Sequence, residues 1–341
     1  MSINMNAVLA APANPSGHVP NRRPDSIRRT STISTHWPDG FGEPMVMRGQ
    51  ARDIFTDEKG AIDLIAEDEF RIRATARREI LAIEVFPDRP EAQKLVGCRA
   101  GGQSRSVLAE ALPDEKAAGT PLYLLLDDFA GASLVAGWAW SRWVDDWRAM
   151  ARTKGTASTA GKNGNMAGIC AGFRPGSTAL DDQGSARQDV QSFAKVPSLV
   201  DPEDPEGWHA LSEQEGVGKR RARWIDIWRE DGLIQMDIGF QDSGTTPEGD
   251  HRAAIHEYRV RATADPDTLV LSSVDVDPRV LPFRECPAAS PNAAIMVGTP
   301  LRELREAVLL ELKGTAGCTH LNDVLRSMAE VPQLAAHLRN G

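Results

Sequence analysis

Apolar residues recur at every second position in two separate regions of the chain, and a period of two is typical of a β-strand with one buried face. In the first region, residues 45–86, the pattern includes Ile62, Leu64 and Ala66, and a further strand ends before Pro87. The second region contains four such stretches, residues 222–228, 233–240, 255–262 and 269–276. Because short turns join neighbouring stretches, each region predicts an antiparallel meander.

Helical periodicity follows each meander. The helical stretches are residues 95–112 and 119–126 after the first meander, and residues 301–308 and 321–328 after the second. Apolar residues in these stretches recur at the 3.6-residue spacing of a helix with one buried face. Runs of strands followed by runs of helices predict an α+β fold.

The two regions also share short sequences. The tetrapeptide Gly119-Thr120-Pro121-Leu122 recurs unchanged as Gly298-Thr299-Pro300-Leu301, and a cysteine follows the last strand of each region, Cys98 and then Cys286. Ala51-Arg52 in the first region matches Ala222-Arg223 in the second. We therefore expect a tandem duplication of an antiparallel strand meander followed by helices.

Composition sets the expected domain boundaries. Residues 1–35 carry an apolar patch ahead of their basic residues, which is the reverse of a secretory signal, so they predict a disordered leader. Residues 36–150 form the first α+β repeat. Residues 151–215, which are rich in Gly, Ala, Ser, Pro and Asp, predict a flexible inserted segment. Residues 216–341 form the second α+β repeat.

Charge and cysteine content limit the function classes. The net charge of −9 argues against nucleic-acid binding, and no apolar run approaches the ~18 residues of a membrane span. We expect a soluble cytoplasmic protein that acts on a small molecule, and an oligomer is compatible with the sequence. Four cysteines in a chain of 341 residues without a signal peptide do not predict a disulfide framework. They are either buried small hydrophobes or thiolates used for chemistry.

Four residues of the second repeat could form one site. They are His256, at the beginning of a predicted strand, Cys286, at a strand–helix junction, and Cys318 and His320, at a helix start after Gly317. Backbone N–H groups at a helix start favour a thiolate. Imidazole and thiolate ligands suit zinc or iron, so the four predict a metal site.

Other roles for the same region stay open. Cys318 and His320 could act without metal as nucleophile and base, with Asp323 nearby. Cys170, on a small apolar island in the inserted segment, could serve as a lid thiol or a fourth ligand. Trp140, Trp143 and Trp147 would share one face of a helix, which is either core or the wall of a pocket for an aromatic or steroid-like substrate.

Three motifs of the C-terminal half are distinctive; they run from Arg279 to Ala288, from Gly298 to Leu301 and from Gly317 to Asp323. They resemble one bacterial protein family, the domain-of-unknown-function family number 2889, and further similarity extends back to about Arg28. The C-terminal half is similar, more remotely, to the U-type iron–sulfur scaffold fold. That resemblance places Cys286 and Cys318 at two ligand cysteines and His256 near a third, where cysteine is usual.

These observations lead to two classes of function. The first is an enzyme of catabolism, a metal-assisted or cysteine-dependent hydrolase or lyase acting on a carbonyl, thioester, aromatic or steroid-like substrate, such as an acyl-coenzyme A. The second is a non-catalytic protein that holds a metal or an iron–sulfur cluster. A third reading makes the cysteines core residues and gives the function to the tryptophan pocket. We favour the enzyme, because two repeats with a segment between them can enclose a substrate.

Overall fold

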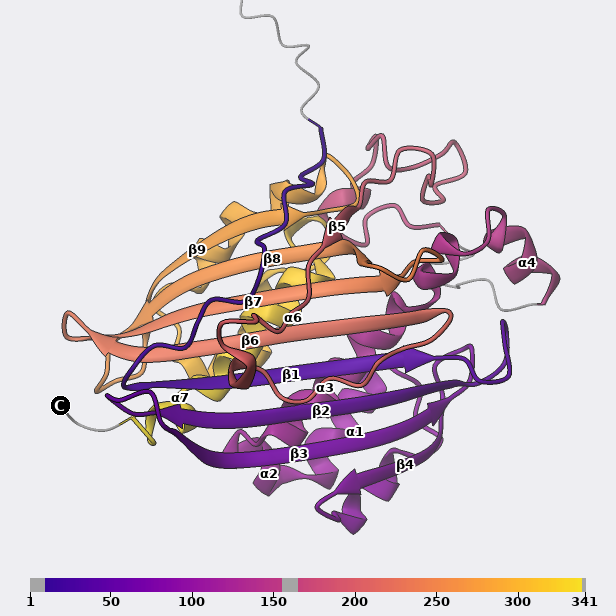
Figure 1. Cartoon of the computed structure of the whole chain (residues 1–341). Helices are drawn as coiled ribbons and strands as arrows, with labels where there is room; N and C mark the ends of the chain where they lie inside the picture. Colours follow the sequence, from indigo (N-terminus) through magenta and orange to yellow (C-terminus); the bar gives the residue numbers. More distant parts are fainter. Residues whose placement is uncertain (1–9, 155–164, 339–341) are drawn as a thin grey trace, which may run out of the picture.

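A nine-stranded antiparallel sheet organises the protein (Figure 1). The structure is a computed structural model, and it describes residues 10–154 and 165–338. Strands β4, β3, β2, β1, β6, β7 and β8 lie side by side in that order, and β8 pairs along different parts of its length with β9 and β5. The fold is therefore α+β with an antiparallel sheet, as the sequence predicts.

Two successive meanders build the sheet. The first consists of β1 (Ser26–His36), β2 (Met45–Thr56), β3 (Ile62–Ala74) and β4 (Ile80–Phe86). The second consists of β6 (Gly218–Glu230), β7 (Leu233–Thr245), β8 (Arg252–Ala264) and β9 (Leu271–Val280), and β5 (Ala194–Val196) is a short addition. Because β1 pairs with β6 along its whole length, the two meanders share one continuous sheet.

Helices of both halves cover one face of the sheet, behind the strands in Figure 1. After the first meander come η1 (Pro90–Leu95), α1 (Gly102–Ala111), α2 (Pro113–Ala118), α3 (Pro121–Leu134), η2 (Ala136–Arg142) and α4 (Trp147–Thr153), where η marks a 3-10 helix. After the second come η6 (Cys286–Met296), η7 (Leu301–Glu303), α5 (Leu304–Glu311), η8 (Gly314–Ala316), α6 (Thr319–Ser327), η9 (Met328–Glu330) and α7 (Val331–Ala335).

A hydrophobic cluster lies between each meander and its helices. The first contains Phe70 and Ile72 of β3 with Phe129 of α3, and the second contains Val260 of β8 with Leu321 of α6. All five side chains are buried. Each meander therefore packs its alternating apolar face against its own helices.

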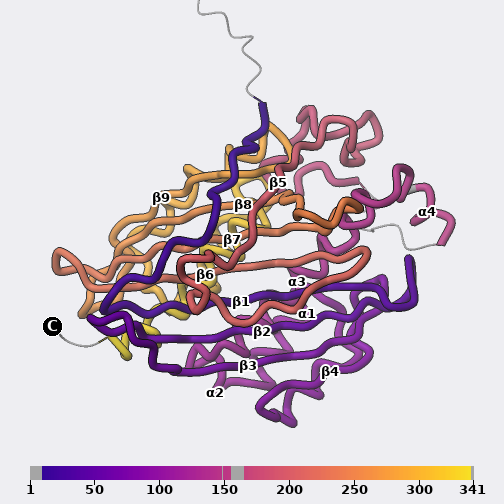
Figure 2. Tube along the Cα trace, in the orientation of Figure 1, coloured from indigo at the N-terminus to yellow at the C-terminus, as the bar shows by residue number. Residues whose placement is uncertain are grey.

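The opposite face of the sheet is covered by chain without regular structure. In Figures 1 and 2 the N-terminal segment and the stretch before β6, which contains η5 (Pro205–Gly207), cross in front of the central strands. Arg28 of β1 donates to Asp226 at 2.6 Å, and the hydroxyls of Thr30 and Thr32 lie 2.8 and 2.7 Å from the ring nitrogens of His209. Polar residues on this face are therefore buried and hydrogen-bonded inside the protein.

The prediction of a disordered leader over residues 1–35 is wrong for its described part, residues 10–35. Asn14 N–H donates to Arg279 O at 2.8 Å, and Leu281 N–H donates to Pro12 O at 2.9 Å. Residues 26–35 lie in β1 at the centre of the sheet, and residues 1–9 lie outside the described part. Arg28 and Arg29 look like residues of a solvated tail in the sequence, but each forms a buried ion pair, with Asp226 and Asp53. The order of apolar and basic residues, on which the leader prediction rests, does not reveal these ion pairs.

The internal repeat has a different alignment from the expected one. Ala51-Arg52 lies in β2 and Ala222-Arg223 in β6, although by order in the meander β6 corresponds to β1. The shift follows from the missed first strand. The shared tetrapeptide begins α3 in the first half, where Thr120 Oγ1 accepts the N–H of Tyr123 at 3.3 Å. In the second half it begins η7, which continues directly into α5.

Most of the predicted inserted segment packs against the second half, while its residues 155–164 lie outside the described part. Ala171 N–H donates to Gly317 O at 2.9 Å, and Ser192 N–H donates to Pro282 O at 2.8 Å. Thr178 Oγ1 donates to the Glu285 carboxylate at 2.8 Å. These bonds bring η4 (Ala171–Phe173) next to η6 and the start of α6.

Among the described helices, none is by itself long and apolar enough to cross a membrane; the bent pair α3 and η2 reaches that length and composition together.

Candidate functional site

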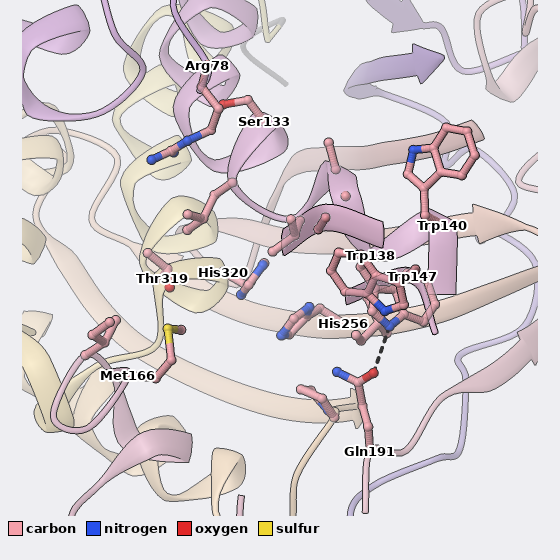
Figure 3. A pocket seen from close by; sticks show the side chains of 18 of the residues that line it. Arg78, Ser133, Trp138, Trp140, Trp147, Met166, Gln191, His256, Thr319 and His320 are labelled. Carbon is pink, nitrogen blue, oxygen red and sulfur yellow. Dashed lines mark hydrogen bonds between the residues drawn. The ribbon is translucent and has the colours of Figure 1, made fainter. Parts of the chain in front are cut away.

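A cavity of about 330 Å³ lies where the first residues of β8 meet η2, η4 and the start of α6. Aromatic side chains from several elements line it: Trp37, Phe41, Trp138, Trp140, Trp147, Phe173 and Phe283. Figure 3 shows Trp138 and Trp147 on one side, Thr319 and Met166 on the other, and His256 and His320 between them. Cys170, Cys286 and Cys318 also line this cavity. The cavity therefore combines apolar walls with imidazole and thiol groups.

Cys318 and His320 reach the cavity from the first turn of α6. Cys318 is the N-cap residue, in an extended conformation, and its carbonyl accepts the N–H of Asn322 at 2.7 Å. The preceding Gly317 lies against the end of α5, because a Cβ atom there would be 2.2 Å from Leu312 O. Only glycine permits this approach, so it fixes where α6 begins.

His256 and Asp242 reach the same place from the sheet. They face each other across β7 and β8, where the register shifts between Asp242 and Ser243. Such an irregularity lets two successive residues of β8, Ile255 and His256, both line the cavity.

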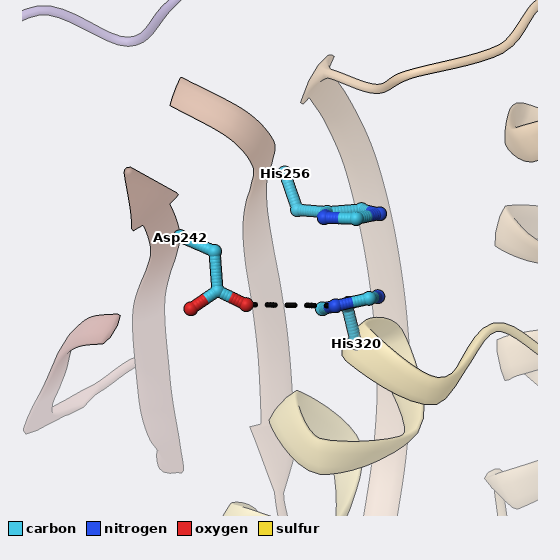
Figure 4. A group of neighbouring side chains, drawn as sticks. All are labelled: Asp242, His256 and His320. Atoms are coloured by element: carbon cyan, nitrogen blue, oxygen red, sulfur yellow. Dashed lines mark ion pairs between the residues drawn. The ribbon is translucent and has the colours of Figure 1, made fainter. Parts of the chain in front are cut away.

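The Cys318 thiol, the His320 imidazole and the Asp242 carboxylate lie in a row. Cys318 Sγ is 3.9 Å from His320 Nδ1, and His320 Nε2 is 3.5 Å from Asp242 Oδ2. Figure 4 shows the Asp242 carboxylate facing the edge of the His320 ring. His320 Nε2 makes no hydrogen bond at this distance. A thiol, an imidazole and a carboxylate in this order can act as a cysteine nucleophile with a base.

His256 stacks on His320. The two ring centroids are 3.4 Å apart with an interplanar angle of 14°, as Figure 4 shows. His256 Nδ1 is buried and has no hydrogen-bond partner among the described residues. The two imidazoles therefore pack face to face, and one buried nitrogen of His256 lacks a hydrogen-bond partner.

Burial keeps the thiol and both imidazoles uncharged. It lowers the pKa of His320 to about 3 and the pKa of His256 well below the usual range. It raises the pKa of Cys318, although the Tyr258 hydroxyl and the backbone N–H groups of Leu321 and His320 favour the thiolate. The resting site therefore contains a thiol beside a neutral imidazole that can accept its proton.

Asp242 stays charged because two cations hold it. Lys219 Nζ donates to Oδ1 at 2.5 Å, and Arg221 donates to both carboxylate oxygens at 3.1 and 2.9 Å. Burial raises the pKa of this carboxyl, but the charges of Arg221 and Lys219 outweigh it and bring the pKa well below the usual range. Burial also lowers the pKa of Lys219 to about 8. Lys219 and Arg221, in the first part of β6, are thus internal counterions of Asp242.

Asp323 does not adjoin His320 as the sequence reading expected. Its carboxylate accepts Arg221 Nη1 at 2.7 Å and Arg105 Nη2 at 3.0 Å, and Arg326 Nη1 lies 3.5 Å away. It lies one turn further along α6, where guanidinium groups surround it. The carboxylate beside His320 is Asp242 instead.

The other two predicted cysteines lie near Cys318. A Cβ atom on Gly172 would be 2.6 Å from Cys286 Sγ and 3.9 Å from Cys170 Sγ, so these thiols meet across η4. Burial is the main cause that raises the pKa of Cys286 and brings the pKa of Cys170 to about 12. Both are thiols in a closed environment.

The tryptophans do not share one helix face, because η2 ends at Arg142 and α4 begins at Trp147. Trp140 and Trp147 line the cavity, and Trp138, which the sequence reading left out, does so too. Trp138 Nε1 donates to Gln191 Oε1 at 2.9 Å (Figure 3). Trp143 instead donates to Thr245 O at 3.1 Å.

A metal ion would find one set of closely spaced ligand atoms among the described residues. Atoms of Asp242, His256 and His320 lie within 4.8 Å of one another. Imidazole lone pairs lie in the ring plane, however, and two nearly parallel rings 3.4 Å apart cannot both direct them at an ion about 2.0–2.1 Å away. A metal would require one ring to turn, and it would share Asp242 with Lys219 and Arg221.

Residues 219–333, about a third of the chain, match the model of a family described as "Protein of unknown function (DUF2889)". The matched part is the second meander with its helices, and it includes the motifs on which the resemblance rests. No curated protein and no solved structure matches the chain. The likeness to the iron–sulfur scaffold fold stays a prediction.

Proposed function

We propose that the protein is a cysteine-dependent acyl-transfer enzyme that cleaves a thioester or an ester of an apolar, aromatic acyl group. Cys318 is the nucleophile, His320 the base, and Asp242 the group that orients His320. The observation that carries the proposal is the row of Cys318 Sγ, His320 and Asp242 with separations of 3.9 and 3.5 Å. Such contacts are often long before a substrate binds.

The reaction follows from these positions. Cys318 Sγ attacks the acyl carbonyl carbon while His320 Nδ1 takes the thiol proton, and Asp242 stabilises the imidazolium that forms. The tetrahedral intermediate collapses, the leaving thiol or alcohol takes the proton from His320, and the acyl group stays on Cys318. Water then attacks the thioester, gives its proton to His320, and releases the carboxylic acid and the Cys318 thiol.

The surroundings support each step. The cavity of about 330 Å³ suits a compact acyl group, and its aromatic walls suit a ring. A neutral imidazole beside a thiol of raised pKa means that proton transfer accompanies the attack. His256, with its unpartnered Nδ1, is placed to bind a substrate oxygen.

Acylation of the protein by 4-nitrophenyl benzoate tests the proposal. Intact-mass spectrometry is expected to show one benzoyl adduct, and peptide mapping is expected to place it on Cys318. Cys318→Ala removes the adduct, whereas Cys98→Ser, which changes a buried cysteine outside the cavity, retains it. His320→Gln slows adduct formation by roughly 10²–10⁴-fold.

An adduct on another cysteine, or none on the wild-type protein at any pH between 6 and 9, contradicts the proposal. Equal acylation rates for wild type and His320→Gln contradict the role of the base. Near-ultraviolet circular dichroism of each variant confirms that the fold is retained.

A metal-dependent enzyme, with zinc or iron held by Asp242, His256 and His320, is the second candidate. The spacing of their ligand atoms and the unpartnered nitrogens of the two histidines favour it. Elemental analysis of protein purified without a metal-affinity tag separates the two. One tightly held ion per chain that is lost in Asp242→Ala supports the metal, and metal-free protein that still forms the benzoyl adduct supports Cys318. A scaffold instead predicts an oxygen-sensitive chromophore after anaerobic reconstitution, and no acylation.

A further inference from the structure

Arginine is the charged residue type that lines the cavity. Arg77, Arg78 and Arg99, at the turn between β3 and β4 and at the segment after η1, contribute to its wall. Within the described part of the chain, no Asp or Glu side chain lines the same cavity. An apolar cavity with cations and no acid in its wall is complementary to an anion.

Arg78 differs from the arginines of the interior that have an acceptor. Arg220 and Arg252 donate to hydroxyl, amide and backbone oxygens. Arg28, Arg29, Arg221, Arg223, Arg305 and Arg326 each contact a carboxylate. Among residues 10–154 and 165–338, the Arg78 guanidinium forms no hydrogen bond or ion pair. Burial and the neighbouring charge of Arg99 lower its pKa. A half-buried cation without a counterion favours the binding of an anion.

The backbone of Arg78 also points to a role for its side chain. Its φ is +66°, in the left-handed region that glycine and asparagine prefer, and it costs about 1 kcal/mol for other residues. Hydrogen bonds hold this conformation, from Arg78 N–H to Thr75 O at 2.8 Å and from Ala100 N–H to Arg78 O at 2.8 Å. Figure 3 shows the Arg78 side chain beside Ser133, on the opposite side of the cavity from Gln191.

We propose that Arg78, with Arg77 and Arg99 beside it, forms an anion subsite that binds a carboxylate or phosphate of the substrate while Cys318 attacks its acyl carbon. The inference rests on the proposed function and adds the substrate class, an aromatic acyl compound with a negative charge at its far end. The charge is either a carboxylate on the acyl part or a phosphate on the leaving group.

Binding measured by tryptophan fluorescence tests the subsite without using Cys318. The probes are 2-naphthoate, its neutral analogue 2-naphthamide, and adenosine 3′,5′-bisphosphate. In wild type, at least one anionic probe is expected to bind more tightly than 2-naphthamide. Arg78→Gln weakens that probe about ten- to a hundredfold, as loss of a charge-assisted hydrogen bond predicts, and leaves 2-naphthamide unchanged.

Two further variants keep the test decisive. Arg78→Asn removes the charge with a residue that accepts positive φ, so it keeps the turn, and it is expected to behave as Arg78→Gln does. Arg73→Gln removes a charge from an exposed position of β3 outside the cavity, and it is expected to change no probe.

The outcomes distinguish the subsite from the reaction. A response of 2-naphthoate places the charge on the acyl part, and a response of the bisphosphate alone places it on the leaving group; both support the subsite. The subsite is contradicted if wild type and Arg78→Asn bind each probe with the same affinity, whether or not Cys318 is acylated. If the Arg78 variants weaken binding but Cys318 forms no benzoyl adduct, the subsite is supported and the proposed acyl transfer is contradicted.

Discussion

Acidification is expected to destabilise the protein well before its carboxylates titrate, because buried histidines must remain uncharged in the folded state. Burial lowers the pKa of His320 and of His209 from 6.5 to about 3, and it lowers the pKa of His256 in the same direction. The unfolded chain binds these protons below pH 6.5 and the folded chain binds them only near pH 3. Stability is therefore full above pH 6.5 and falls as the pH drops towards 3.

The magnitude follows from the size of each shift. At pH 5 a histidine with a folded pKa of about 3 and an unfolded pKa of 6.5 lowers the free energy of unfolding by about 2 kcal/mol. His209 and His320 together remove about 4 kcal/mol, and His256 adds to the loss. Since folded proteins are stable by about 5–15 kcal/mol, this is a large share.

Urea unfolding at pH 7.5 and pH 5.0, followed by tryptophan fluorescence, measures the effect. His320→Gln and His209→Gln are each expected to reduce the pH difference by about 2 kcal/mol. His209→Gln is the control for His320→Gln, because His209 is also buried but lies between Thr30 and Thr32 on the other face of the sheet. Only His320→Gln is expected to slow alkylation of Cys318. A wild-type protein equally stable at both pH values, or variants that keep its full pH difference, would refute the reasoning.

Two further predictions concern packing and charge around the site. Gly172→Ala places a Cβ atom 2.6 Å from Cys286 Sγ and is expected to cost about 1–3 kcal/mol, and adding Cys286→Ala restores most of it, as thermal unfolding of the single and double variants measures. Asp242→Asn leaves Lys219 and Arg221 without their shared carboxylate and is expected to cost about 3–5 kcal/mol at pH 7. Because the buried Lys219 can lose its proton at high pH, denaturant titration at pH 9 is expected to give a smaller loss; an equal loss at both pH values contradicts this.

Alternation of apolar residues located the strands of the second meander but not their ends. The stretch predicted at residues 222–228 belongs to β6, which begins at Gly218, and the stretch at residues 233–240 belongs to β7, which continues to Thr245. The added ends carry charged or small polar side chains, Lys219 and Ser243 among them. Periodicity cannot find such residues, because ion pairs and hydrogen bonds bury them rather than the hydrophobic effect.

For the same reason, apolar periodicity does not predict β1. Its sequence places arginines, serines and threonines on both faces, and it reads as a solvated tail. In the structure one face meets the helices, where Arg29 contacts Asp53 and Glu330, and the other meets the covering chain, where Arg28 contacts Asp226. Each partner is far away in the sequence except Asp53, so no local pattern signals the burial.

The residues of the candidate site also differ in whether the local sequence can identify them. Cys318 and His320 are two residues apart at a helix start, and a glycine turn followed by this pair was a sufficient local signal. Asp242 has no such signal, since it reaches His320 only through the pairing of β7 with β8 and the register shift next to it. Asp323 was the natural choice from sequence because it is close along the chain.

Asp242 also provides the physical distinction between the two proposed chemistries. Its single negative charge already meets Lys219 and Arg221, and an imidazolium at His320 adds a transient third cation during proton transfer. A bound divalent ion would add two lasting charges to the same carboxylate, which Lys219 can relieve by releasing its proton. Because the pKa of Lys219 is about 8, metal affinity would then rise as the pH increases towards that value and level off above it. Acylation of Cys318 through His320 has no such requirement and proceeds with Lys219 protonated.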